Sequence, residues 1–108
     1  MSAADAQAAA EAAAAAKARE AELDRIEHEI DQLTGRAASV NSSVEGIRQQ
    51  QAAMGVGLRG DVASHLASMQ ANLAKAQDAI GRGDVERAKR YTGLADRDVE
   101  ALEKFLNR

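Results

Sequence analysis

The sequence predicts an all-α chain, and three observations lead to that prediction. Proline is absent, and alanine, the strongest helix former, dominates the hydrophobic 45% of the 108 residues. Apolar side chains recur in alternating steps of three and four. Glycines cluster at two places that separate the periodic segments. We therefore expect a long heptad-patterned first helix followed by an antiparallel helical hairpin, which together form a three-helix coiled-coil bundle.

The first helix is predicted from about residue 2 to about residue 51. Ser2 and Asp5 have the spacing of a capping box at its start. The heptad seam of this helix consists of Leu23, Ile26, Ile30, Leu33, Ala37, Val40, Val44 and Ile47. The same phase reaches back through Ala16, Ala12 and Ala9, where the seam is thin. Gly35 lies inside this stretch, and a break near it would give a four-helix bundle instead.

The remaining elements follow from glycines and aspartates. Three glycines between residues 54 and 60 predict a turn, and Asp61 is the expected N-cap of a helix over 61–80. Gly81 is expected to end that helix in a left-handed conformation. Residues 81–83 then form a second turn, and Asp84 caps a third helix over 84–106. By this division, residues 1–34 form an acidic, Ala-rich helical arm and residues 35–108 form the bundle.

The arm predicts an interaction function. A hairpin of two helices about 30 Å long covers less than half of a first helix about 75 Å long. The N-terminal part of the seam would then face water unless another chain covered it. We expect a homo-oligomer, with a dimer favoured, or binding to another helical protein. The residues expected to carry this interaction are Leu23, Ile26, Ile30, Leu33, Val40, Val44 and Ile47.

Two histidines are the candidates for chemistry. His28 could join Asp24 and Asp31 on one helix face as a metal-ligand set, although a solvated acidic face is the favoured interpretation. His65 follows Ser64, and Asp61 lies one turn away, but a helix surface offers no free backbone donors for an oxyanion. We expect no catalytic residue, no metal site and no cofactor.

Other patterns favour structural explanations. Arg-Gly-Asp occurs at residues 59–61 and 82–84, where glycine turns the chain and aspartate caps a helix. A basic group could bind phosphate or anionic lipid, but acidic residues are interleaved with it. It consists of Arg82, Arg87, Lys89, Arg90 and Arg97.

Composition excludes several partner classes. Only one tyrosine and one phenylalanine are present, so bases have no stacking platform and nucleic acid is not expected as a partner. No apolar run approaches the roughly 20 residues that span a bilayer. The absence of cysteine leaves the compartment undetermined. Of the possible locations for a soluble chain, the cytoplasm is favoured.

About half of the chain resembles helical segments of known proteins. The residues that carry the resemblance are 83–91, Leu94, Ala95 and 99–106, together with 58–61. They are similar to helical C-terminal regions of bacterial multidomain proteins, including some eukaryotic-like serine/threonine kinases, and to a generic tetratricopeptide-type hairpin. No kinase motif is present in the sequence. The resemblance implies an accessory or oligomerisation segment without activity of its own.

Overall fold

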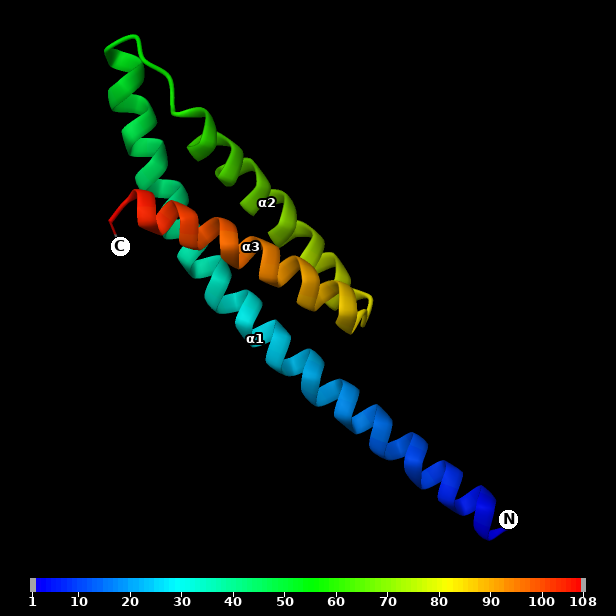
Figure 1. The fold of residues 1–108 in the computed structure, drawn as a ribbon. Helices are drawn as coiled ribbons and strands as arrows, with labels where there is room; N and C mark the ends of the chain where they lie inside the picture. The colour runs from blue at the N-terminus through cyan, green and yellow to red at the C-terminus, as the bar shows by residue number, and fades with distance from the viewer. Residues whose placement is uncertain (1, 108) are drawn as a thin grey trace.

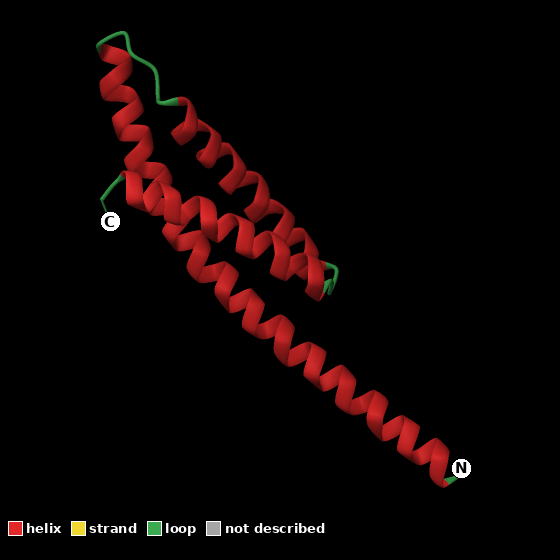
Figure 2. Cartoon of the chain, viewed as in Figure 1, coloured by secondary structure: helices red, strands yellow, loops and turns green. Residues whose placement is uncertain are grey.

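The computed structural model describes residues 2–107, which form three helices and no strand (Figures 1 and 2). They are α1 (Ala3–Ala53), α2 (Gly60–Gly81) and α3 (Val85–Phe105). The molecule is elongated, with principal extents of 77 × 19 × 17 Å. The predicted fold of a long first helix followed by a helical hairpin is confirmed. α1 runs unbroken through Gly35, so the four-helix alternative is wrong.

Packing on one face explains why α1 continues through Gly35. An internal glycine costs a helix about 1 kcal/mol relative to alanine. Gly35 itself is exposed, whereas Leu33 and Ala37 on either side of it are 3% and 4% exposed. Because these neighbours are buried against the hairpin, their packing holds the backbone helical across the glycine.

Capping residues fix the start of two helices. The Ser2 hydroxyl accepts a bond from the Asp5 amide at 3.1 Å, and the Asp5 carboxylate accepts one from the Ser2 amide at 3.3 Å. The predicted capping box is therefore confirmed. Asp84 caps α3 by accepting a bond from the Arg87 amide at 3.1 Å. The prediction that Asp61 is an N-cap is wrong, because α2 already begins at Gly60 and has no side-chain cap.

Left-handed glycines end the first two helices. Gly55 and Gly83 have φ values of 76° and 69°, which side-chain-bearing residues rarely adopt. After α2, the Asp84 amide donates to the Ala79 carbonyl at 2.9 Å and the Gly83 amide to the Ile80 carbonyl at 3.0 Å, the bonding pattern of a Schellman motif. The left-handed stop is therefore at Gly83 and not at Gly81, where it was predicted.

The core lies where the hairpin meets the middle of α1. One cluster of buried side chains comprises Leu33, Ala37, Val40, Val44, Val62, Met69, Ala95, Val99 and Leu102. A second, smaller cluster comprises Ile26, Ile30, Ala76, Ala79 and Ala88. Figure 1 shows α3 crossing the middle of α1 with α2 beside it, while the N-terminal part of α1 projects beyond both. The hairpin therefore covers the seam of α1 and leaves its alanine-rich start free.

Candidate functional site

The residues predicted to carry the interaction lie in the core of the chain itself. Five of them are buried, and Leu23 and Ile47 at the two ends of the seam are partly exposed. The buried ones are Ile26, Ile30, Leu33, Val40 and Val44. The expectation that the N-terminal part of this seam faces water is therefore wrong. These side chains meet α2 and α3 of the same molecule.

The loop between α1 and α2 is the reason for this error. Residues 54–59 run back along α1 before α2 begins, so the hairpin starts beside an earlier part of α1 than its last turn. Val62 near the start of α2 therefore packs in the same cluster as Val44. At the other end, Lys89 near the start of α3 forms an ion pair with Glu22. The bundle thus reaches back to about residue 22, well before the predicted boundary at residue 34.

The free part of the molecule is the arm, which we define as residues 3–21. Every residue of the arm is exposed, and its polar or charged side chains are Asp5, Gln7, Glu11, Lys17, Arg19 and Glu20. Between residues 8 and 16 the only residue other than alanine is Glu11. Its helical state depends on alanine propensity, on the capping box and on continuity with the packed part of α1. The arm is thus a preformed helix whose side chains are small and, apart from Glu11, uncharged between residues 8 and 16.

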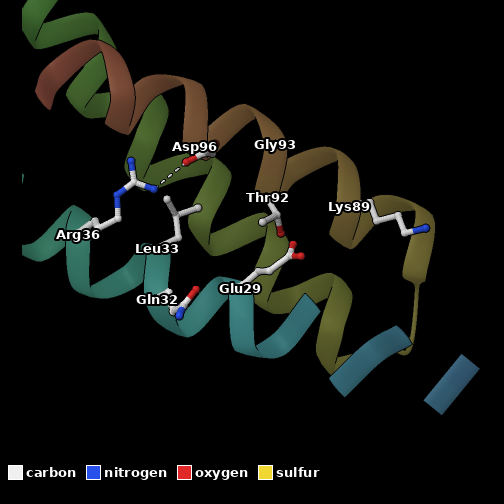
Figure 3. Close-up of a pocket in the computed structure, with 8 residues that line it drawn as sticks. All are labelled: Glu29, Gln32, Leu33, Arg36, Lys89, Thr92, Gly93 and Asp96. Atoms are coloured by element: carbon white, nitrogen blue, oxygen red, sulfur yellow. Dashed lines mark hydrogen bonds and ion pairs between the residues drawn. The ribbon is translucent and has the colours of Figure 1, made fainter. Parts of the chain in front are cut away.

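A groove of about 610 Å³ runs between α1 and α3, beside the bundle core. It is lined by Glu29, Gln32, Leu33 and Arg36 from α1 and by Lys89, Thr92, Gly93 and Asp96 from α3 (Figure 3). Thr92 is 7% exposed, and its hydroxyl oxygen has no hydrogen-bond partner among the described residues. Figure 3 shows this hydroxyl directed from α3 toward the Glu29 side of the groove. The groove thus contains a buried donor that no group within residues 2–107 satisfies.

Gly93 has no side chain, so the α3 side of the groove is shallow next to this hydroxyl. A Cβ atom added to Gly93 would meet nothing within 4 Å. A glycine inside a helix costs about 1 kcal/mol relative to alanine, and no positive φ requires it here. Within the single chain, therefore, neither packing nor backbone conformation explains the glycine.

Arg36 of α1 forms hydrogen bonds across the groove to α3. Its guanidinium donates to Asp96 at 2.9 Å and to Glu103 at 2.5 Å, joining α1 to α3. The hydrogen bond with Glu103 is the main reason that the pKa of Arg36 is raised above its usual range. Because the Arg36 side chain is 42% exposed, this network orients the helices more than it stabilises them.

His65 belongs to a polar cluster that the sequence analysis missed. Its Nδ1 lies 3.0 Å from a carboxylate oxygen of Asp98, a residue only 8% exposed. The Ser68 hydroxyl donates to the same carboxylate at 2.7 Å, and the Asn72 amide donates to it at 3.4 Å. Asp61, the acid considered from the sequence, pairs with Arg59 instead. The only signal for Asp98 was an acidic residue next to the core position Val99.

This cluster joins α2 to α3 and has no arrangement for nucleophilic catalysis. In a catalytic triad the histidine lies between the nucleophile and the acid. Here the acid is central, so the hydroxyl proton of Ser68 points at Asp98 and not at an imidazole nitrogen. Three donors around one buried carboxylate are the expected solution for burying such a charge.

The remaining candidate residues lie apart from one another or are paired. Within residues 2–107, no group of three or more His, Asp or Glu side chains could hold a metal ion, and His28 is exposed. In the basic group, the Arg82, Arg87 and Lys89 side chains each form an ion pair with an acidic residue. None of the described helices is long and apolar enough to cross a membrane. At the loop after α1, Met54 and Val56 are 73% and 53% exposed.

Comparisons with protein-family models, curated proteins and solved structures find no match to this chain. The resemblance to C-terminal regions of bacterial multidomain proteins therefore stays an expectation from the sequence.

Proposed function

We propose that the chain is a non-catalytic module that self-associates through helix packing, with the arm as its contact surface. The observation that carries this proposal is the exposure of all residues from Ala3 to Ala21 in the same continuous helix that supplies the core. In proteins, packing of one helix face against another element is the main source of helix stability, and the arm has no such partner among the described residues. A dimer is the favoured assembly because closed two-fold symmetry is the commonest form of self-association.

Two features support a structural and not an enzymatic role. The buried carboxylate of Asp98 is occupied by three donors within the bundle. The groove between α1 and α3 contains no histidine, and its Arg36 and Lys89 are both engaged in ion pairs. The implied relation to accessory segments of bacterial proteins agrees with such a role.

A partner-binding adaptor is the rival function. The exposed Met54 and Val56 at the opposite end of the molecule favour it, because they offer an apolar surface far from the arm. An adaptor would be monomeric alone, whereas the proposed module would not. Sedimentation equilibrium of the full chain separates the two: dimers at micromolar concentration support self-association, and a monomer at all concentrations up to about 1 mM refutes it.

The arm is tested by charged substitutions that keep it helical. Replacing Ala8, Ala12 and Ala15 together with glutamate adds charges to exposed positions and should abolish the dimer while leaving the bundle folded. Ala71→Glu on the exposed face of α2 is the matched control and should change nothing. Dissociation by the control alone would move the contact surface from the arm to α2. Substitution of Ile30 cannot serve here, since this residue is 4% exposed and its loss would disrupt the core.

A further inference from the structure

The groove between α1 and α3 combines features that a packed three-helix bundle does not need. Thr92 offers a hydroxyl donor that is more than nine-tenths buried and unpartnered within the described chain. Next to it, the glycine at position 93 leaves the backbone of α3 uncovered. Another helix can approach this uncovered backbone closely only if its own side chains are small. The groove is therefore shaped for a fourth helix with a thin face.

We infer that the occupant is the arm of a second copy, lying antiparallel to α1 and α3. This inference rests on the self-association proposed above and names its site. The length agrees: the 19 residues of the arm span about 28 Å, and the 21 residues of α3 span about 31 Å. In a two-fold symmetric pair each arm lies in the groove of the other copy, so both grooves are filled.

The register follows from where the bundle ends. Each arm can slide along the other copy until the two bundles meet, which places the two-fold axis at residue 22. Residues 8–15 of one copy then lie beside residues 29–36 of the other, the stretch of α1 that lines the groove. That segment is the one in which all residues but Glu11 are alanine. The part of the arm with the smallest side chains thus falls on the groove.

Glu11 is the one residue of this alanine segment that can form a hydrogen bond with the groove through its side chain. In this register it lies level with Leu33 of the other copy, within one helical turn of Arg36. Its carboxylate is an acceptor, and the groove offers the unpaired Thr92 hydroxyl as a donor. Within the single chain Glu11 bonds only weakly, accepting from the Gln7 amide at 3.3 Å.

The contact is small, so the dimer is weak. Two strips about 28 Å long and about 10 Å wide, counted on both copies, bury on the order of 1,100 Å². Specific interfaces commonly bury about 1,200–2,000 Å², so we expect a dissociation constant in the micromolar range. The paired molecule would be about 93 Å long, whereas pairing of the arms alone would give about 123 Å. Small-angle scattering distinguishes these lengths from each other and from the 77 Å of one chain.

Disulfide trapping tests the placement directly, because the natural chain has no cysteine. Full-length chains carrying Ala14→Cys and Gly93→Cys, one of them with a size tag, are mixed and oxidised. A cross-link between the two is expected, and none is expected between Ala14→Cys and the control Ala71→Cys on α2. A chain carrying Ala12→Cys tests the alternative in which the two arms pair with each other. If sedimentation shows a dimer but only this chain forms a cross-link, between its own copies, the groove inference is wrong and self-association stands. If the chain is a monomer, both proposals fail.

Substitutions in the groove test whether the missing side chain at Gly93 admits the arm. Gly93→Leu should leave the isolated chain folded, because the added side chain points into open space, and should weaken the dimer at least tenfold. Gly46→Leu is the matched control: this helix glycine is also open but lies beyond the reach of the arm. Glu11→Ala and Thr92→Val should each weaken the dimer about fivefold, and together no more than either alone. A dimer as strong as that of the natural chain in Gly93→Leu, Glu11→Ala and Thr92→Val would overturn the inference.

Discussion

The seam of α1 should behave as a folding core, and Ile26→Ala measures this. Ile26 is 1% exposed and packs in the smaller cluster, where most of its buried neighbours are the alanines 76, 79 and 88. Removing three carbons costs about 2.4 kcal/mol in lost transfer free energy. The short alanine side chains cannot move to fill the cavity, which adds about 1 kcal/mol. The free energy of unfolding should therefore fall by about 3.5 kcal/mol.

Urea unfolding followed by circular dichroism, at concentrations where the chain is monomeric, checks this value. A domain of this size has about 5–10 kcal/mol of stability, so the midpoint should drop by a third or more at unchanged slope. Ala9→Gly is the control, because it costs about 1 kcal/mol of local helix in the free arm and should leave the midpoint alone. A midpoint unaffected by Ile26→Ala, with association lost instead, would show that the seam serves a second chain and would refute the assignment of the core.

Three further outcomes follow from the polar contacts and turns. The Arg59 guanidinium lowers the pKa of Asp61 to about 2, so the stability from this ion pair is present above about pH 4 and lost as the pH falls through about 2. An NMR titration should show that Arg59→Ala returns this carboxyl to its ordinary range. Asp98→Ala should lower the free energy of unfolding, measured in urea, by about 2–3 kcal/mol because three donors lose their acceptor. A loss below about 0.5 kcal/mol would contradict the assigned bonds. Gly83→Ala should cost about 1 kcal/mol at its positive φ, whereas Gly81→Ala should not destabilise.

Most of the fold could be predicted from the sequence because its signals are local. The three-four rhythm, the glycine clusters and the capping residues placed all three helices to within about two residues of their bounds. The failures came from side chains whose role depends on a distant partner. Asp61 reads as a cap from its neighbours, but it pairs with Arg59. Asp98 reads as a surface acid, but the turn of the hairpin brings His65 and Ser68 to it.

The candidate site was harder to predict because a heptad pattern specifies the period of a seam but not its partner. The same eight positions of α1 would suit a second chain or the chain's own hairpin equally well. The path of six loop residues decided between them, and no local signal specifies that path. The unsatisfied hydroxyl of Thr92 is a property of the assembled groove and has no sequence signature.

Side-chain size marks the boundary between arm and bundle where heptad phase does not. The phase continues without change from Ala9 to Ile47, and following it placed the boundary too late. Leu23 is the first large apolar residue after Met1, and Glu22 beside it forms an ion pair with Lys89 of the hairpin. Burial of an alanine releases little free energy, so a hairpin longer than this one would gain little by extending over the arm. The hairpin therefore ends where large side chains end, and the arm is left for a surface that small side chains fit.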